Sequence, residues 1–219
     1  MITAIISSIR GLGEEYEDYG SVRGNGKNVL ETFALYEDYE NGRKIFTNYY
    51  TTFSEQMSFQ NIIQYLKDNP KEFQSRGVSF GISEIQTAFN SIGNSKAVTM
   101  LVSTVAAQTR KLNCDMYYDL QILWEAGNRL RNQTDVILRP IKLHADGTIC
   151  LKDSCEEEHW VIAHSIKPPK PYNILRDEKG NEMAINCQEI GKLYDTNELI
   201  FDEIIIPTKK NSKKVCEED

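Results

Sequence analysis

The strongest constraint on the fold is a glycine-rich turn at residues 23–28, RGNGKN, which leads directly into a strongly helical segment at 29–39. Glycines let the backbone fold tightly with several N–H groups pointing inward, and a helix N-terminus adds partial positive charge. The ammonium group of the lysine can reach the outer phosphates of a bound polyphosphate. The candidate phosphate-binding residues are therefore Gly24, Asn25, Gly26, Lys27 and Asn28.

The turn departs from the pattern G-x-x-x-x-G-K-[ST], because Ser21 stands at the first glycine and Asn28 at the hydroxyl position. A short Gly-Lys turn can also simply begin a helix. The order of segments favours the phosphate-binding interpretation. Residues 16–22 are expected to form a short strand, Asn41 and Gly42 to end the helix, and residues 43–50 to form a β-rich segment. Strand, glycine loop, helix and strand is the order of a phosphate-binding βαβ unit.

Composition indicates one sizeable α/β domain, or one domain with a small appendage. The chain has 219 residues, of which 40% are apolar and 26% charged. No apolar run approaches the roughly 20 residues that span a bilayer, so no membrane partner is expected. Five cysteines at irregular spacing favour a reducing compartment. The net charge of −7 argues against a surface that attracts nucleic acid everywhere, although a local basic lining remains compatible with it.

Further elements can be placed from caps and periodicity. The opening segment MITAIISSI is expected to be a strand or helix of the fold, and Ser58 to cap a helix that ends near residues 69–70. Strands are predicted at 77–83, 114–122, 135–143 and 159–166, a helix at 98–110, and a hairpin turn at Asp146 and Gly147. We expect a core with a β-hairpin at 1–167, a peripheral extension at 168–208, and a charged, disordered tail at 209–219.

A second chemical signal is FGISEIQ at 80–86, an apolar strand that ends in an acidic residue. After a phosphate loop, Glu84 would orient or deprotonate the water that attacks the γ-phosphate. Ser83 occupies the position where an aspartate usually holds Mg²⁺ through its water shell. We therefore expect Asn28 and Ser83, both neutral, to be the magnesium ligands. Without the glycine loop, a surface glutamate at a strand end would be the preferred interpretation.

The third signal lies at the end of the next strand. Gln121 can sense the γ-phosphate from the strand tip, and Arg131 can stabilise transition-state charge across a subunit boundary, with Arg129 as its reserve. The alternative for either arginine is a solvated basic turn that pairs with Asp135.

These segments together resemble a known family. GSVRGNGKN, FGISEIQTAF, TRKLNCDMYYDLQ, NRLRNQTDVILRP and the closing LYDTNE are similar to motifs of the viral DNA-packaging and zonula-occludens-toxin-like ATPases of the FtsK–HerA group. The resemblance extends from residue 16 to about 140, and again over 193–198. It implies a RecA-like P-loop fold with a mostly parallel sheet flanked by helices. The resemblance also implies a role for each of four residues. Lys27 would bind the phosphates, Glu84 would be the catalytic base and Gln121 the γ-phosphate sensor. Arg131 would be the arginine finger that acts in trans.

The resemblance also implies cofactors and partners. These are ATP with Mg²⁺, double-stranded DNA, a homo-oligomeric ring, a capsid or portal protein, and a location in the host cytoplasm. The leading hypothesis is ATP-driven DNA translocation for viral genome packaging. Since Asn28 and Ser83 are atypical, a nucleotide-binding subunit without turnover is the alternative. A third hypothesis is an accessory protein whose loop grips the phosphates of a nucleic acid.

Two other patterns carry alternatives. The segment LIFDE at 199–203 matches an apolar strand with an Asp-Glu end better than 80–84 does, so Asp202 and Glu203 would bind the metal if the sheet were permuted. His144, Cys150, Cys155 and His159 could be brought together by a hairpin. Their spacing matches no known zinc pattern, and Cys150 fits a strand interior, so the sequence does not predict zinc there.

Overall fold

The computed structural model describes residues 1–8, 24–69, 71, 75–86, 111, 113–126, 128–152, 155–166, 173–174 and 183–195. Its strands are β1 (Ile2–Ser8), β2 (Lys44–Thr47), β3 (Glu55–Gln56), β4 (Val78–Ile82), β5 (Cys114–Ile122), β6 (Val136–His144), β7 (His159–Ser165), β8 (Asn173–Ile174) and β9 (Ala184–Asn186). Its helices are α1 (Lys27–Glu40), α2 (Phe59–Asp68), the 3₁₀-helix η1 (Leu123–Glu125), α6 (Asn128–Gln133) and α7 (Cys187–Ile190).

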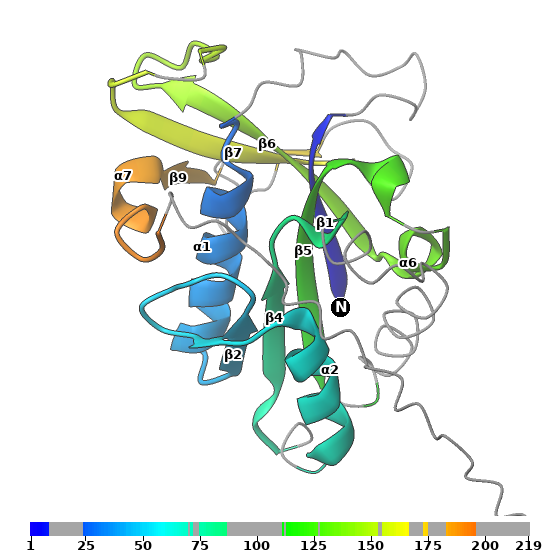
Figure 1. Ribbon diagram of the computed structural model, residues 1–219. Coiled ribbons are helices and arrows are strands. Elements are labelled where there is room, and N and C mark those ends of the chain that lie inside the picture. Colours follow the sequence, from blue (N-terminus) through cyan, green and yellow to red (C-terminus); the bar gives the residue numbers. More distant parts are fainter. Residues whose placement is uncertain are drawn as a thin grey trace, which may run out of the picture.

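The described strands form one nine-stranded sheet in the order β3-β2-β4-β5-β1-β6-β7-β8, with β9 also paired to β7. Pairing is parallel from β3 to β6 and antiparallel from β6 onward. The glycine loop and α1 follow β1, and β5 lies between β1 and β4 (Figure 1). This topology confirms the predicted α/β fold of RecA-like type, a mostly parallel sheet with a C-terminal antiparallel extension.

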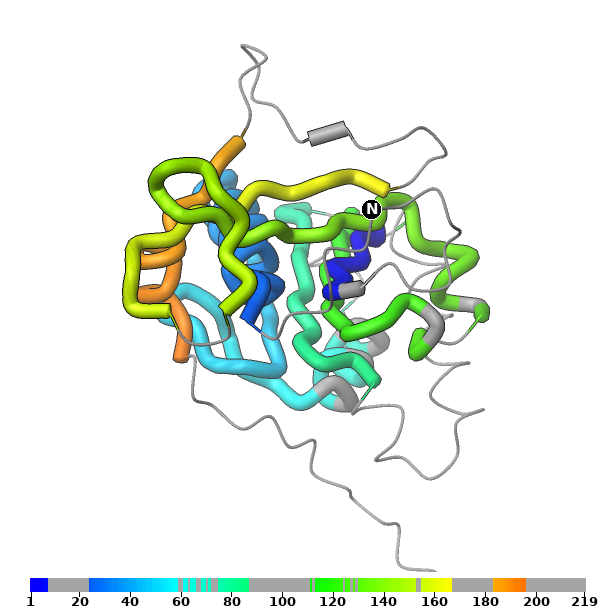
Figure 2. Tube along the Cα trace, turned by 90° about the horizontal axis from the view of Figure 1, so that it is seen from above, coloured from blue at the N-terminus to red at the C-terminus, as the bar shows by residue number. Residues whose placement is uncertain are grey.

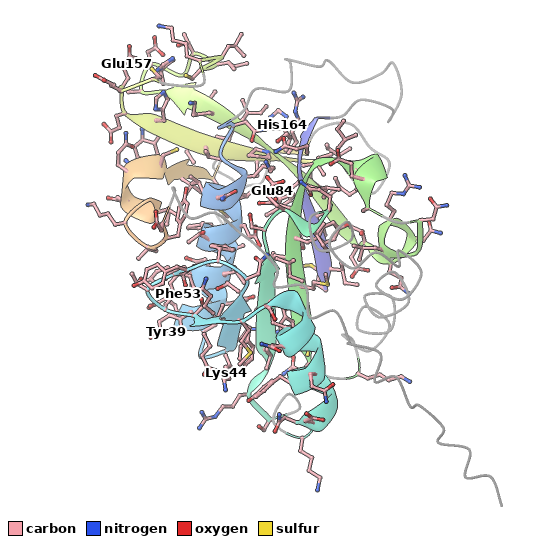
Figure 3. The ribbon with its side chains drawn as sticks, viewed as in Figure 1. Tyr39, Lys44, Phe53, Glu84, Glu157 and His164 are labelled. Carbon is pink, nitrogen blue, oxygen red and sulfur yellow. The ribbon has the colours of Figure 1, made fainter. Side chains whose placement is uncertain are left out.

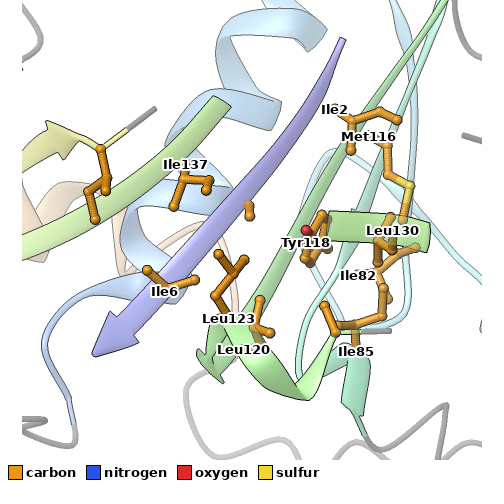
Figure 4. Packing of buried hydrophobic residues seen from close by; sticks show 13 residues of the cluster. Ile2, Ile6, Ile82, Ile85, Met116, Tyr118, Leu120, Leu123, Leu130 and Ile137 are labelled. Carbon is orange, nitrogen blue, oxygen red and sulfur yellow. The ribbon is translucent and has the colours of Figure 1, made fainter. Parts of the chain in front are cut away.

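Strict alternation along the strands gives the sheet two different faces. On one face, β1, β5 and β6 contribute apolar side chains that pack with α6 and η1 (Figure 4). Ile62 of α2 joins a second cluster on β2 and β4. The main cluster comprises Ile2, Ala4, Ile6, Ile82, Ile85, Met116, Tyr118, Leu120, Leu123, Ala126, Leu130, Ile137 and Ile166.

Helix α1 covers the opposite face. Its apolar residues contact β1, β2, β5, β6 and β7, as Leu35 does with Ile45 and Tyr117. Close approach depends on Gly81 in β4, where an added Cβ would lie 2.4 Å from Cδ1 of Leu35. A side chain at this position would force the buried Leu35 side chain, or the helix that carries it, to shift. The arrangement of α1 over the strand ends is therefore tightly constrained.

Most of the local predictions are confirmed. Helix α1 ends at Asn41 with Gly42 at φ 82°, and the Ser58 hydroxyl accepts a hydrogen bond from the Asn61 N–H at the start of α2. The opening segment is the central strand β1. The strand expected at 16–22 and the helix expected at 98–110 lie outside the described residues. Past the turn at Gly147, the described residues form an isolated bridge between Ile149 and Leu143, and β7 is the long antiparallel partner of β6.

The longer of the two described parts of the C-terminal extension, 183–195, packs on the core. Ile185 and Ile190 join a cluster with Val29 and Leu30 of α1 and Val161 of β7. Figure 2 shows this segment beside α1. The predicted domain boundaries at 167 and 208 fall in residues outside the description and stay predictions.

None of the described helices combines the length and the apolar character needed to cross a membrane.

Candidate functional site

An open cavity of about 700 Å³ lies at the edge of the sheet where β1, β4 and β5 end. In parallel α/β sheets, the carboxyl ends of the strands form the crevice in which ligands bind. The cavity is lined by Gly24, Asn25, Gly26, Lys27, Asn28, Val29, Glu84, Gln121, Ile122 and Tyr194.

The glycine loop forms the wall from which α1 begins. Gly26 is the N-cap of the helix at φ 96°, a left-handed conformation that favours glycine, and its carbonyl accepts the Leu30 N–H at 3.0 Å. A Cβ at Gly26 would lie 2.4 Å from Cγ2 of Val161 in β7. The first turn of α1 holds no acidic residue, so the positive end of the helix faces the cavity without a counter-charge from the helix's own first turn.

Three polar side chains from separate segments meet inside the cavity. Nζ of Lys27, at the start of α1, lies 3.7 Å from Oε1 of Glu84, which follows β4. Nε2 of Gln121, near the end of β5, donates to the same Glu84 oxygen at 3.2 Å. Figure 3 labels Glu84 beside the start of α1. Lys27 is largely buried, while the Glu84 side chain is 32% exposed and accessible from the cavity.

The backbone at Glu84 is held in an unusual conformation. Its φ of 51° is left-handed, which costs a non-glycine residue of order 1 kcal/mol or more. Asp119 of β5 compensates, because its Oδ1 accepts the Glu84 N–H at 2.8 Å and its Oδ2 accepts the Ser83 hydroxyl at 2.9 Å. The Asn48 amide closes the other side, accepting the Ser83 N–H at 2.8 Å and donating to the Ser83 carbonyl at 2.9 Å. These bonds fix the direction of the Glu84 side chain.

Two buried carboxyl groups lie beneath Lys27. Glu31 follows one turn later on α1 and contacts Asp119, and both residues are fully buried. Burial is the main cause that raises the pKa of Glu31 well above its ordinary value, and the charge of Asp119 raises it further. Burial also raises the pKa of Asp119, against the opposing effect of Lys27. Burial therefore favours the protonated form of Glu31, whereas at Asp119 the charge of Lys27 opposes the same effect.

The structure brings together most of the residues predicted from the sequence. The five loop residues, Glu84 and Gln121 all line one cavity. Ser83 is 1% exposed and does not line it, and its hydroxyl is engaged with Asp119. Arg131 lies on α6, where it donates to the side chain of Asn128, and is also not among the lining residues. Its role in a neighbouring subunit stays a prediction, as does magnesium binding by Asn28 and Ser83.

Sequence reasoning missed Asp119, Glu31 and the lining role of Tyr194. Asp119 lies two residues before Gln121 on β5, so the two share a face, and Glu31 lies four residues after Lys27 on α1. Both spacings could be recognised in the sequence once Gln121 and Lys27 had been chosen as candidate site residues. Tyr194 belongs to the LYDTNE motif and pairs with Thr51 in an isolated bridge. Residues 196–203, including Asp202 and Glu203, lie outside the described part of the chain.

No protein-family model and no curated protein matches this chain. Among solved structures, the KaiC-like protein PH0186 of Pyrococcus horikoshii OT3 is 7% identical, with a TM-score of 0.48, over 84% of this chain and 88% of that one. The N-terminal domain of zonular occludens toxin from Neisseria meningitidis is 15% identical, with a TM-score of 0.44, over 88% of this chain and 98% of that one. Both similarities concern the course of the backbone, and the assignments below rest on the geometry of this chain.

Proposed function

We propose that the cavity binds a nucleoside triphosphate, ATP with Mg²⁺, and that the site belongs to a P-loop ATPase. The observation that carries this proposal is the convergence of Lys27, Glu84 and Gln121 from three separate segments at the helix N-terminus. Each has a distinct task in phosphoryl transfer, namely charge compensation, water orientation and sensing of the γ-phosphate. A loop that only initiates a helix would need none of these partners.

The Lys27–Glu84 pair is the state expected before phosphates enter. Phosphate oxygens between them would replace Glu84 as the partners of the Lys27 ammonium group, and N–H groups of the loop would donate further hydrogen bonds to the phosphates. Glu84 would then be released toward an attacking water and accept its proton. Gln121, which donates to Glu84 here, would be free to donate to a γ-phosphate oxygen.

Of the residues considered for magnesium, Asn28 lines the cavity, while Asp119 is buried and places a carboxylate behind Ser83. Asn28 lines the cavity and offers a carbonyl oxygen. The Ser83 hydroxyl donates to Asp119, so the negative charge that an aspartate at 83 would bring is supplied from the adjacent strand. Bound magnesium would neutralise charge on the phosphates. This location of the charge favours an active ATPase over the alternative, a nucleotide-binding subunit without turnover.

The finer proposal is ATP-driven translocation of double-stranded DNA, in viral genome packaging. It includes a homo-oligomeric ring in which Arg131 completes the site of a neighbour, a capsid or portal partner, and action in the host cytoplasm. Its support is the order of the motifs in the sequence, together with the location of Arg131 outside its own subunit's cavity. No arginine is among the described residues that line the cavity, so in this proposal the transition-state arginine comes from a neighbouring subunit.

Calorimetric titration with ATP and Mg²⁺ tests nucleotide binding. Lys27→Ala should abolish measurable binding, whereas the control Lys44→Ala should bind as the wild type does, because Lys44 opens β2 at the opposite edge of the sheet. Unchanged affinity in Lys27→Ala would refute the phosphate-loop assignment. ATPase activity measured with and without double-stranded DNA then separates a DNA-stimulated motor from a binding-only subunit.

Hydrolysis is tested at Glu84. Glu84→Gln should keep ATP affinity and lose turnover by about 10²–10⁴-fold, since the amide cannot accept a proton. The matched control is Glu125→Gln, an exposed glutamate of η1. Wild-type turnover in Glu84→Gln would remove Glu84 from the mechanism. A wild type that binds ATP and never turns over would support the regulatory alternative instead.

A further inference from the structure

A second cluster of chemically reactive side chains lies at the tip of the β6–β7 hairpin. The ligand atoms of His144, Cys150, Cys155 and His159 all lie within 4.8 Å of one another. Two of the chain's three histidines and two of its five cysteines thus meet within one short segment. Figure 3 labels Glu157 at this tip, while Glu84 marks the cavity and His164 the other end of β7.

The pairing of the strands brings the two histidines together. His144 is the last residue of β6 and His159 the first of β7, and they lie directly opposite each other in the antiparallel ladder. Their ring centroids are 4.9 Å apart. Cross-strand neighbours on one face of a sheet lie close enough to share a ligand.

The turn after β6 adds the first cysteine. Asp146 accepts hydrogen bonds from the Thr148 N–H at 2.9 Å and from its hydroxyl at 2.7 Å, and Gly147 has φ 84°. The chain therefore folds back on the end of β6, where the Cys150 N–H donates to the Lys142 carbonyl at 2.9 Å. Cys155 approaches from the segment that returns toward β7.

Burial and missing partners single out this cluster. Cys150 is 4% exposed and His159 is 5% exposed. Nε2 of His159 is buried and has no hydrogen-bond partner among the described residues. All four cysteines in the described ranges are free thiols, so the two in the cluster do not form a disulfide. A buried polar nitrogen without a partner costs free energy that a bound ligand would recover.

We propose that His144, Cys150, Cys155 and His159 bind a Zn²⁺ ion in a tetrahedral site. Two thiolates and two neutral imidazoles form a common structural zinc set, and the thiolates cancel the charge of the ion. Binding forms two Zn–S and two Zn–N bonds and displaces the two thiol protons to solvent. Magnesium and calcium prefer oxygen ligands, so they do not suit this set.

A neighbouring carboxylate fits the same role. Oε2 of Glu157 lies 2.9 Å from Nδ1 of His144. Carboxylates in this position commonly fix the ring and tautomer of a metal-bound histidine. The ion would join both ends of the 144–159 segment, which holds the exposed apolar side chains Ile149 and Leu151. This role is structural and does not depend on nucleotide binding.

Metal content of the full chain tests the proposal directly. The untagged protein, purified after growth with added zinc, should hold one zinc ion per chain by plasma mass spectrometry. Substitution with Co²⁺ should give the visible absorption of a tetrahedral site with thiolate ligands. Cys150→Ser with Cys155→Ser should lose both signals, while Cys187→Ser, a free cysteine outside the cluster, should keep them. A metal-free wild type, or equal zinc loss in Cys187→Ser, would overturn the site.

Thiol alkylation of the wild type keeps the test valid if the double variant fails to fold. With zinc present, Cys150 and Cys155 should be protected from iodoacetamide. A zinc chelator should expose at least Cys155, which is already partly accessible, and leave the rate at Cys187 unchanged. Rates at Cys150 and Cys155 that do not respond to zinc would contradict the proposal, as would a disulfide between them in the purified protein.

Discussion

At the scale of single residues, the carboxylate expected at position 83, at the end of β4, is found at Asp119 on the neighbouring strand β5. The sequence presents a neutral Ser83 where an aspartate was expected, and in the fold Asp119 supplies a carboxylate directly behind it. This arrangement follows from parallel pairing, because β4 and β5 end at the same edge. Replacing Ser83 by aspartate alone would therefore set two buried carboxylates against each other, at a cost in stability.

The first prediction concerns magnesium. Asp119→Asn keeps the size of the side chain and removes its charge, so the Mg²⁺ concentration for half-maximal ATP binding should rise about 10–100-fold. Moving the carboxylate with Ser83→Asp and Asp119→Ser should restore most of the response. Asp115→Asn, on the same face at the other end of β5, is the control. If Asp119→Asn binds with the wild-type magnesium requirement, the charge of Asp119 does not serve the metal.

The second prediction concerns pH. Burial and Asp119 raise the folded-state pKa of Glu31 above its ordinary value of 4.5. The contribution of Glu31 to the free energy of unfolding is fully present below about pH 4.5. It is lost as pH rises toward the folded-state pKa, at about 1.4 kcal/mol per pH unit. Glu31→Gln avoids this loss. The difference in free energy of unfolding between Glu31→Gln and the wild type, measured with urea, should be small near pH 4.5 and increase in favour of the variant toward neutral pH. A difference independent of pH would mean that Glu31 does not titrate as inferred.

At the scale of elements, the junction of loop and helix depends on β7. Gly26 has a left-handed backbone and lies against Val161 of β7. The antiparallel extension therefore packs directly on the glycine loop. This contact connects β7, a strand late in the chain, to the glycine loop that precedes α1.

The third prediction separates these two requirements. Gly26→Ala should destabilise the fold by about 2–4 kcal/mol, because it adds backbone strain to steric overlap with Val161. Gly42→Ala should cost only about 1 kcal/mol, since Gly42 has φ 82° but nothing within 4 Å of an added Cβ. Thermal unfolding of both variants measures the difference. Equal losses would show that Val161 does not restrict the loop.

Elements with local signals could be predicted, and pairings between distant segments could not. The cap at Ser58 and the alternation of β5 identified their elements, and the strand ends located Glu84 and Gln121. The inward direction of Ser83 depends on Asp119, which is 36 residues away. The spacing of the cysteines and histidines did not predict their cluster, because its geometry comes from the cross-strand register of His144 and His159. Sequence spacing alone carries no such register.

At the scale of the whole molecule, the location of Arg131 makes assembly testable. The fourth prediction is that Arg131→Ala and Lys27→Ala chains, each inactive alone, regain partial ATPase activity when mixed. A finger from one chain would then serve the intact loop of another. The control Arg76→Ala, an exposed arginine just before β4, should be active by itself. Mixtures that stay inactive while both variants oligomerise would refute the role in trans.

The central position of β1 also determines when this sheet can be completed during synthesis. Ile2 lies opposite Met116, and Thr3 lies opposite both Tyr117 and Val136, so both partners of the strand are made far later. At roughly 5–20 residues per second, the ribosome leaves this apolar strand unpaired for on the order of ten seconds. Its edges can meet other nascent chains during that interval. Production of the protein should therefore benefit from a low expression level, which makes encounters between nascent chains rarer, or from a chaperone that shields the newly made β1 segment.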